Sequence, residues 1–343
     1  MHAFLARALY DLAAAQSAAL VVLGDRLGLY RAMRGAGSLT PGELAARTGL
    51  DERYVREWLF NQACGGYLSH VPEAGTFELP EEQARALAEE GGRVFLAGSF
   101  QTALAALKSM DAVEEAFRSG GGIPSSAYDP DLAEGMARTS RARYQAELLQ
   151  RYIPALDGMK ERLEVGASVA DVGCGSGAAL LLLARAFPHS RFVGFDASER
   201  ALEMARAAAR AAGLGEGLRF ERAPATDFPG EGYDLVTSFE SLHDVGDPLG
   251  VARRVLRALG PDGRWLIVEP LVGEGVDVDT PWGRLASSMS VLHCLPVSIA
   301  DGGPGLGPLA GERGVTEVLA AAGFGSWSRV AASAFQLVIQ ARP

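Results

Sequence analysis

The sequence predicts an α/β protein in which a parallel sheet follows an α-helical N-terminal domain. Three observations predict this fold class. Beyond about residue 151, short apolar runs alternate with helical patterns, as they do in parallel α/β sheets. A glycine-rich turn at 171–177 separates one of these runs from a helical segment. The first 95 residues instead contain helix signals and a single short hairpin pattern.

The N-terminal region has the helix signals of a helix-turn-helix. Residues 3–23 form an alanine- and leucine-rich pattern without a helix breaker. A second helix is expected to begin at Thr40, which is followed by a proline at the first helical position and by Glu43 at the third. Asp51 is expected to cap the next helix. Residues 67–79 suggest two strands and a turn, so we expect a winged helix.

The change of pattern along the 343 residues predicts three segments. We expect a winged-helix-like domain over 1–95, a helical linker or lid over 96–150 and the α/β domain over 151–343. Residues 1–95 contain nine arginines and no lysine against twelve acidic residues, and the whole chain carries a formal net charge of −10. Because neutralisation of phosphates dominates DNA affinity, we interpret the first segment as a dimerisation module rather than a nucleic-acid reader.

Cysteine usage and hydropathy predict a cytoplasmic protein. Cys64, Cys174 and Cys294 are too few and too widely spaced for a disulfide framework or a CxxC metal site, and they fit a reducing compartment. The first residues lack the long apolar segment of a secretory signal. The most apolar early run, residues 18–23, is shorter than the ~20 residues that a membrane span needs, so we expect no membrane partner.

The glycine-rich turn at 171–177 predicts a nucleotide-like ligand. It has the sequence DVGCGSG and joins a short apolar strand to a helix, the geometry that brings backbone close to a ligand at a helix N-terminus. A second strand, residues 191–195, ends at Asp196, 19 residues after Gly177, where a carboxylate accepts hydrogen bonds from ribose hydroxyls. A nicotinamide dehydrogenase is a distant alternative, because its turn has the form GxGxxG.

Residues 165–343 resemble the class I S-adenosylmethionine (SAM)-dependent methyltransferases. The segment 171–177 looks like their first motif, Phe195-Asp196 like their second and 224–229 like the third, although Pro224 stands where the family usually has an aspartate. The resemblance implies a Rossmann-like seven-stranded methyltransferase sheet with a last, antiparallel strand near 335–339. It also implies that SAM is bound by Asp171, Gly173, Cys174, Gly175, Gly177, Asp196, Ala197, Ala225, Thr226, Asp227 and Phe239.

The whole chain is similar to a bacterial subgroup of these enzymes with an N-terminal winged-helix domain. The resemblance implies a homodimer that transfers a methyl group to O or C of a small, partly apolar acceptor, as members of secondary metabolism do. A SAM-sensing transcription regulator built on the first domain is the alternative from another class. On the charge argument above, we do not expect nucleic acid as a partner.

Two histidines are candidates for the chemistry. His243 follows the fourth predicted strand, at the carboxyl edge of the sheet where ligands of α/β proteins bind, and similar small-molecule O-methyltransferases use a histidine there as base. His293 lies in the insertion before the last helix, a usual place for acceptor binding. The resemblance extends to α-keto acid C-methyltransferases, in which two histidines hold a metal. A divalent or trivalent ion at His243 and His293 is therefore a second possibility, in which the ion acts as a Lewis acid.

The helical stretch before the α/β domain contains polar and aromatic residues with two open interpretations. They either cover the acceptor site, with an arginine pairing an acceptor carboxylate, or form an ordinary solvated face. These residues are Tyr128, Arg141, Arg143 and Tyr144.

Overall fold

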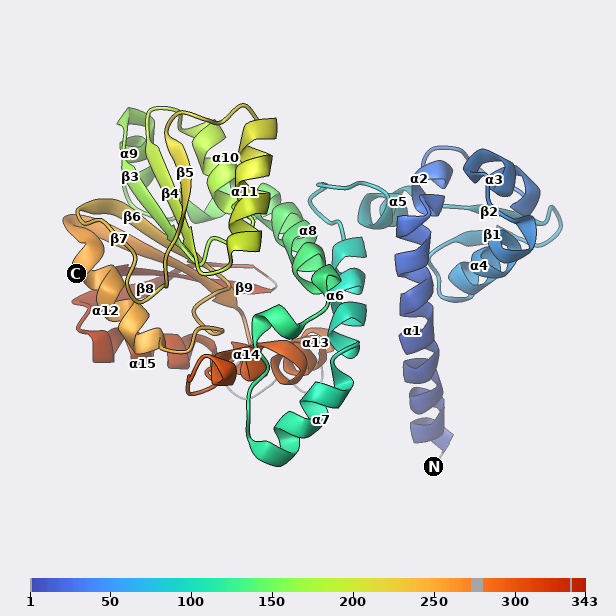
Figure 1. The fold of residues 1–343 in the computed structure, drawn as a ribbon. Helices are drawn as coiled ribbons and strands as arrows, with labels where there is room; N and C mark the ends of the chain where they lie inside the picture. The colour runs from blue at the N-terminus through green and yellow to red at the C-terminus, as the bar shows by residue number, and fades with distance from the viewer. Residues whose placement is uncertain (1, 273–279, 334) are drawn as a thin grey trace. The chain divides into compact units, whose positions relative to one another are not determined.

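The computed structural model describes residues 2–272, 280–333 and 335–343. These residues form two compact units, one from Met1–Ala105 with Pro130–Arg143 and the other from Ala106–Asp129 with Tyr144–Pro343 (Figure 1). The segment predicted as a linker or lid, 96–150, is therefore divided between the two units. Two helices, α6 (Ala97–Leu107) and α8 (Pro130–Glu147), contribute residues to both.

The first unit has the predicted helices and hairpin. Its further elements are α1 (His2–Arg26), α2 (Leu29–Met33), α3 (Pro41–Thr48), α4 (Glu52–Cys64), β1 (Ser69–Val71), β2 (Thr76–Glu78) and α5 (Glu81–Leu87). The side chain of Thr40 accepts a hydrogen bond from the backbone of Glu43, whose carboxylate accepts one from the backbone of Thr40, which is the expected capping box. The carboxylate of Asp51 caps α4 as predicted, and β1 pairs with β2 in an antiparallel hairpin.

An apolar core holds the first unit together. The rings of Tyr30 and Trp58 meet edge to face with their centroids 5.0 Å apart. Both polar tips are satisfied, since the Tyr30 hydroxyl donates to Gln62 at 2.5 Å and the Trp58 indole donates to the Leu20 carbonyl at 2.9 Å. These contacts fix α1, α2 and α4 against one another.

The second unit is built on a seven-stranded sheet with the order β5-β4-β3-β6-β7-β9-β8. The strands are β3 (Ser168–Val172), β4 (Arg191–Asp196), β5 (Leu218–Arg222), β6 (Tyr233–Phe239), β7 (Leu259–Pro270), β8 (Ser326–Ala332) and β9 (Gln336–Arg342). The first five are parallel, and β9 runs antiparallel between β7 and β8. The predicted α/β fold with a last antiparallel strand is confirmed.

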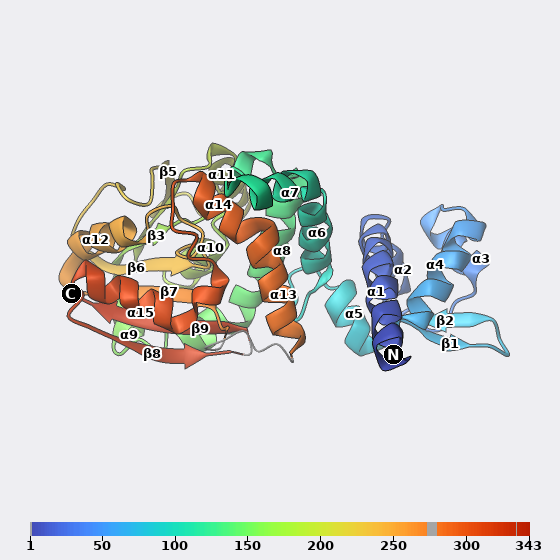
Figure 2. The same cartoon turned by 90° about the horizontal axis from the view of Figure 1, so that it is seen from below.

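Helices cover both faces of this sheet (Figures 1 and 2). The helices of the second unit are α7 (Met110–Ser119), α9 (Met159–Val165), α10 (Ala178–Ala186), α11 (Glu199–Ala211), α12 (Pro248–Ala258), α13 (Pro281–Met289), α14 (Leu295–Ala300) and α15 (Gly311–Ala322), with the short turns η1 (Ser125–Ala127), η2 (Leu148–Tyr152), η3 (Ser290–Cys294) and η4 (Pro308–Ala310). Helices α9, α10 and α11 pack on Val169 and Phe192 of one face, whereas α12 and α15 pack on Val193 and Ile267 of the other. Neighbouring strand residues point to opposite faces, so both cores arise from continuous apolar runs.

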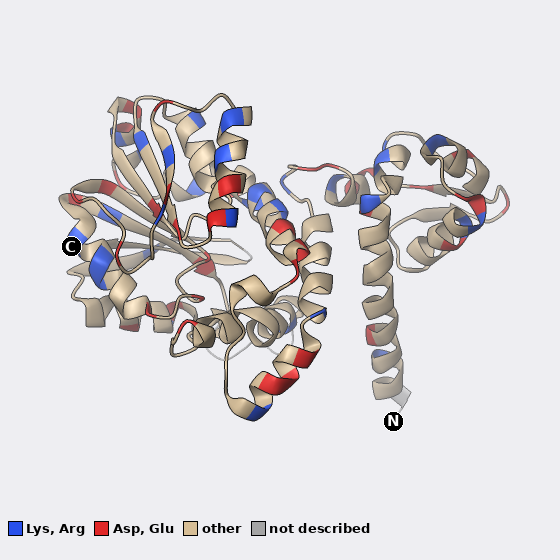
Figure 3. Ribbon diagram, viewed as in Figure 1, with Lys and Arg blue, Asp and Glu red and all other residues tan. Residues whose placement is uncertain are grey.

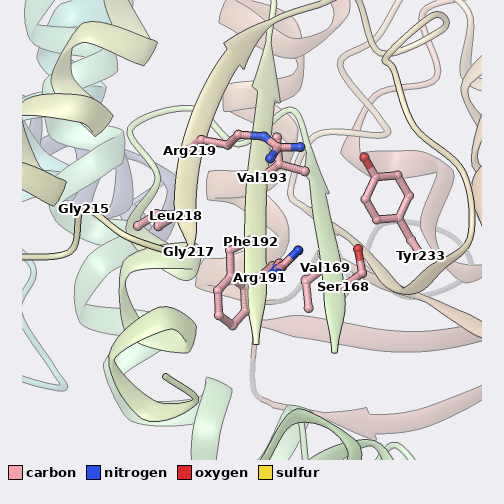
Figure 4. Close-up of a pocket in the computed structure, with 10 residues that line it drawn as sticks. All are labelled: Ser168, Val169, Arg191, Phe192, Val193, Gly215, Gly217, Leu218, Arg219 and Tyr233. Carbon is pink, nitrogen blue, oxygen red and sulfur yellow. The ribbon is translucent and has the colours of Figure 1, made fainter. Parts of the chain in front are cut away.

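A cavity of about 470 Å³ lies where the strands begin (Figure 4). It is lined by Ser168, Val169, Arg191, Phe192, Val193, Gly215, Gly217, Leu218, Arg219 and Tyr233. The connection from β5 to β6, residues 223–232, has turns and no helix in the described chain, which leaves this part of the sheet less covered. Since parallel strands all begin at one edge, this cavity lies away from the carboxyl ends where the candidate ligand site is predicted.

Helix α1 leaves apolar side chains uncovered. Figure 3 shows that few charged residues lie along it. The large residues that remain more than half exposed are Phe4, Leu5, Leu9, Tyr10 and Leu12. By length and composition, Ala3–Arg26 meets the criterion for a membrane-crossing helix among the described residues, but the core helices of soluble proteins and N-terminal signal sequences pass the same test. This apolar surface is longer than the run at 18–23 suggests, because alanines and large apolar residues continue the helix towards its N-terminus.

Candidate active site

Four parallel strands bring the candidate residues to one edge of the sheet. Asp171 lies near the end of β3, Asp196 ends β4, Phe239 ends β6 and Glu269 lies near the end of β7. The pairing registers set β3 between β4 and β6, with β7 next. Because parallel strands end at the same edge, the predicted cofactor and acceptor residues come from adjacent loops, although they are distant in sequence.

The glycines of the turn are required by backbone conformation. Gly173, Gly175 and Gly177 have φ angles of 75°, 52° and 74°, a region that residues with a Cβ rarely adopt. A Cβ on Gly177 would also lie 2.6 Å from the ring of Phe220, so that position is closed by packing as well. A Cβ on Gly175 would meet nothing within 4 Å. Gly175 is therefore the position at which a ligand has room to approach the backbone.

Asp196 ties the glycine turn to the next strand. One of its carboxylate oxygens accepts a hydrogen bond from the backbone N–H of Gly175 at 2.8 Å, and the other accepts one from Ser198 at 2.8 Å. The side chain is only partly buried, and each oxygen retains a lone pair. A ligand in the turn therefore meets a carboxylate that is already oriented, and neighbouring Ala197 is exposed beside it.

Asp171 is a fully buried carboxyl group behind the turn. The Thr237 hydroxyl donates to it at 2.7 Å. Burial raises the pKa of Asp171 to about 7 and the charge of Asp196 adds to the increase, while the Thr237 hydrogen bond opposes it. Cys174 is partly buried nearby, and desolvation raises the pKa of its thiol well above the usual range. A cation placed in the turn stabilises the ionised form of Asp171, so the site favours a positively charged ligand.

The predicted adenine-lining segment forms a tight turn. The backbone N–H of Asp227 donates to the carbonyl of Pro224 at 3.0 Å, and Ala225, Thr226 and Asp227 are half-buried or exposed at the surface of this turn. Ala223 donates to the carbonyl of Asp196 at 3.2 Å, which places the segment beside the candidate ribose site. The structure thus brings these three residues to the same strand edge as the glycine turn.

The residue after β6 has an unusual backbone. Glu240 has a φ of 50° and is the only residue other than glycine with positive φ in the described chain. Such strain occurs where the surrounding structure fixes it, often near functional sites. Here the bend is fixed by a hydrogen bond from the Glu240 N–H to the Val268 carbonyl at 2.7 Å. It turns the chain so that Ser241 packs on Gly173. Phe239, the last residue of β6, packs on Tyr144 with ring centroids 5.0 Å apart.

His243 is buried between two carboxylates. Its Nδ1 is hydrogen-bonded to Glu269, whose other oxygen accepts the backbone N–H of Leu242 at 2.9 Å. Its Nε2 lies 3.1 Å from Oδ1 of Asp244. Burial lowers the pKa of His243, but the charges of Asp244 and Glu269 outweigh burial, so the pKa lies well above its usual value. The raised pKa favours the protonated imidazole. His243 can therefore accept a proton only together with Asp244, whose carboxylate shares the proton on Nε2.

Cys294 completes a group of possible metal ligands. One ligand atom each from His243, Asp244 and Cys294 lies within 4.8 Å of the others, and we call these three residues the His–Asp–Cys cluster. Burial raises the pKa of the Cys294 thiol to about 12, and Asp244 adds to the increase. His293 precedes Cys294 and is also buried, with its Nδ1 3.8 Å from the Cys294 sulfur. The two metal ligands predicted from the sequence, His243 and His293, thus share only His243 with the His–Asp–Cys cluster. Metal binding by that pair stays a prediction.

Three of these site residues were missed from the sequence. Asp244 and Cys294 lie directly beside the two histidines, and Glu269 stands near the end of a buried strand. A carboxylate that ends an apolar run at the carboxyl edge was a usable signal for Glu269. Nothing in the spacing could bring Cys294 to His243, because the contact depends on how η3 packs against the loop after β6.

Helix α14 and the loop after it hold the loop that carries His243. The Gly307 N–H donates to the His243 carbonyl at 3.1 Å, and the Ser298 hydroxyl donates to the Val245 carbonyl at 3.1 Å. A Cβ on Gly246 would lie 2.2 Å from the Asp301 carbonyl oxygen, so the two segments are in close contact. Residues far apart in sequence therefore hold the candidate base in one orientation.

Comparison with known proteins adds two domain families. Residues 163–292 match the model of a methyltransferase domain, and residues 15–89 match that of an Rv2258c-like winged helix-turn-helix domain. The 27-O-demethylrifamycin SV methyltransferase of Amycolatopsis mediterranei is 33% identical over 147 residues, which are 42% of this chain and 52% of that protein. The match thus spans about half the length of that relative.

Solved structures share the fold over the whole chain. The mitomycin 7-O-methyltransferase MmcR has a TM-score of 0.72 at 20% identity, covering 100% of this chain and 99% of that one. The O-methyltransferase NcsB1 from neocarzinostatin biosynthesis, in complex with S-adenosyl-L-homocysteine (SAH) and 1,4-dihydroxy-2-naphthoic acid, has a TM-score of 0.63 at 19% identity, covering 98% of each chain. These structures show the shared fold, and the two family matches place a winged helix-turn-helix domain in residues 15–89 and a methyltransferase domain in residues 163–292, as the sequence predicted.

Proposed function

We propose that this protein transfers the methyl group of SAM to O or C of a small, partly apolar acceptor. The observation that carries the proposal is the glycine turn at 173–177, which faces the oriented carboxylate of Asp196 at the carboxyl edge of a methyltransferase-family sheet. SAM carries a sulfonium and an ammonium group, which suit the nearby carboxylate of Asp171, and its ribose hydroxyls suit the carboxylate of Asp196. The relatives named above act on antibiotic-type small molecules, which supports an acceptor of secondary metabolism.

In this proposal the chain positions the reactants and takes up one proton. SAM is already activated, so methyl transfer needs alignment of the acceptor with the sulfonium carbon. An acceptor hydroxyl would give its proton to the His243–Asp244 pair, in which Glu269 keeps the imidazole oriented from the opposite nitrogen. The roles of the cofactor-binding residues named from the sequence are part of this proposal.

Calorimetry and a labelled-methyl screen test the proposal. Purified protein is expected to bind SAM and SAH but not NAD, and to move a labelled methyl group from SAM to a component of a pooled metabolite extract. Mass spectrometry would detect the product by the mass of the labelled group. NAD binding in place of SAM would contradict the assignment. SAM binding without transfer, together with a salt-dependent shift of DNA in a gel, would favour the regulator instead.

A second candidate, metal-assisted C-methylation of an α-keto acid, is favoured by the His–Asp–Cys cluster. Its residues fit a metal: the buried Asp244 Oδ1 has no hydrogen bond of good geometry and lies 3.1 Å from Nε2 of His243, and Glu269 engages Nδ1, so Nε2 is the ligand atom on the side of Asp244. A nitrogen, an oxygen and a sulfur donor suit Fe, Co, Ni or Zn better than Mg or Ca. A bound metal would supply Lewis-acid stabilisation of an enolate. His243, Asp244 and Cys294 would hold it.

We further propose that α1 pairs two copies of this chain. Its apolar residues lie on more than one side of the helix, and only 11% of its most apolar window is buried within the chain. The surface that best matches a long apolar helix in length and character is the same helix of a second copy, and twofold pairing is self-complementary.

We also propose a cytoplasmic location, with which the free cysteines are consistent.

The dimer proposal predicts that a charge on α1 separates the subunits. Leu9 is 57% exposed, and Leu9→Glu is expected to convert a dimer into a monomer, because burying an unpaired carboxylate in an apolar interface is unfavourable. Light scattering coupled to size-exclusion chromatography measures this change. Phe117→Glu on α7 is the matched control, since Phe117 is 75% exposed and should leave the mass unchanged. A monomeric wild type that floats with lipid vesicles would instead assign α1 to a membrane surface.

A further inference from the structure

The turn that carries His293 and Cys294 is a π-helix. Residues Ser290–Cys294 form η3 between α13 and α14, and the N–H of Leu295 donates to the carbonyl of Ser290, five residues back. π-turns insert one residue into a helix and are often found at functional sites. The inserted residue changes the direction in which the side chains of the turn point, so whatever fixes η3 also fixes His293 and Cys294.

Pro296 leaves a carbonyl of this turn without its α-helical partner. In an α-helix the carbonyl of Leu292 would accept the N–H of residue 296, and a proline has none. The hydroxyl of Tyr128 takes this place, since it donates to the Leu292 carbonyl at 2.9 Å. A buried carbonyl without a donor is costly, so this long-range hydrogen bond stabilises the turn. Burial raises the pKa of Tyr128 to about 12, which keeps its hydroxyl a donor at neutral pH.

The same tyrosine also contacts the histidine of the turn. The Tyr128 ring meets the His293 ring edge to face, with centroids 4.9 Å apart, and both side chains are buried. The segment before Tyr128 is held on α14 as well: Ile123 donates its N–H to the Pro296 carbonyl at 2.9 Å. A Cβ on Gly122 would lie 2.0 Å from the backbone nitrogen of Ala300. The glycine-rich stretch before Tyr128 is therefore packed tightly against α14.

We propose that Tyr128 is a positioning residue, which holds the π-turn η3 so that Cys294 and His293 face the His243–Asp244 pair. The inference rests on the proposed function for its consequence, because the residues that η3 presents would contact the acceptor or hold the metal. The inference gives the segment Ser125–Tyr128 a role in methyl transfer. It does not place the Tyr128 side chain among the reacting groups.

The test compares Tyr128→Phe with Tyr152→Phe. The first removes only the hydroxyl that bonds the turn. The second removes a buried hydroxyl that donates to Gln336 at 2.6 Å, a contact that does not involve η3. Native protein is treated with N-ethylmaleimide, and peptide mass spectrometry gives the alkylation rates of buried Cys294 and exposed Cys64 in the same molecules. Tyr128→Phe is expected to raise the Cys294 rate relative to Cys64 by about tenfold, and Tyr152→Phe is expected to leave it unchanged.

A kinetic readout separates positioning from simple stability. With the acceptor found in the labelled-methyl screen, Tyr128→Phe is expected to lower kcat several-fold, while the calorimetric Kd for SAM stays that of the wild type. An unchanged Cys294 rate, or an equal increase in Tyr152→Phe, would overturn the inference. Failure of the proposed function would appear separately, as a wild type that neither binds SAM nor transfers a methyl group, and the alkylation rates would still decide whether Tyr128 holds the turn.

Discussion

Asp196→Ala is expected to weaken SAM binding by about 10- to 150-fold, the equivalent of ~1.5–3 kcal/mol for a hydrogen-bonded charged group. Two effects add in the same direction. The substitution removes the carboxylate that is proposed to bind the ribose, and it releases the N–H groups of Gly175 and Ser198 that this carboxylate now orients. Titration calorimetry with SAM and with SAH measures the loss, which should be similar for both because they share the ribose.

Two variants make this result specific. Asp196→Asn keeps the size of the side chain and one acceptor oxygen, so its loss should be intermediate if both effects operate. Asp111→Ala removes an exposed carboxylate on α7, away from the glycine turn, and controls for the change in net charge. Wild-type affinity in Asp196→Ala would exclude Asp196 from the cofactor site.

The local geometry of the candidate cofactor site could be predicted from sequence because its residues are close together along the chain. Strand, turn and helix follow one another within 171–186, and the glycine positions depend on backbone angles that few other residues adopt. Asp196 was found in the same way, since it ends the next strand of a parallel sheet. Capping patterns at Thr40 and Asp51 likewise depend on three or four neighbouring residues. Each of these signals involves residues that are close together in the sequence, so it can be recognised without knowledge of the fold.

The acceptor half could not be predicted to the same extent because it is assembled from distant segments. Glu269 reaches His243 only because β6 and β7 are neighbours in the sheet. Cys294 reaches the cluster through a π-turn, and no periodicity in the sequence reveals that extra residue. Tyr128 carried two open interpretations, and its hydrogen bond spans 164 residues of sequence. Long-range packing, rather than residue type, decides which polar groups meet there.

His243→Ala is expected to lower kcat by about 10²- to 10⁴-fold, the usual contribution of a positioned acid–base group. His243→Ala also leaves Glu269 and Asp244 without the imidazole between them. Glu269→Gln is therefore a second, less disruptive variant, because it keeps His243 and weakens only the hydrogen bond that orients the ring. Steady-state kinetics with the acceptor from the screen measure both losses. A wild-type rate in His243→Ala would show that the acceptor loses its proton without help from this residue.

Elemental analysis decides whether the same histidine acts as a base or as a metal ligand. If the His–Asp–Cys cluster holds a metal, purified wild type should contain it, and His243→Ala and Cys294→Ser should each lose both metal and activity. Glu269→Gln should reduce metal affinity about 10- to 100-fold, because the Glu269 carboxylate orients the ligating imidazole through its other nitrogen, Nδ1. His293→Gln discriminates between the two ligand sets: retention of metal assigns the third ligand to Cys294, whereas its loss supports the pair predicted from sequence. Metal-free wild type with turnover that resists chelators would leave the His243–Asp244 pair as the proton acceptor, since no ion would then compete with the proton on Nε2.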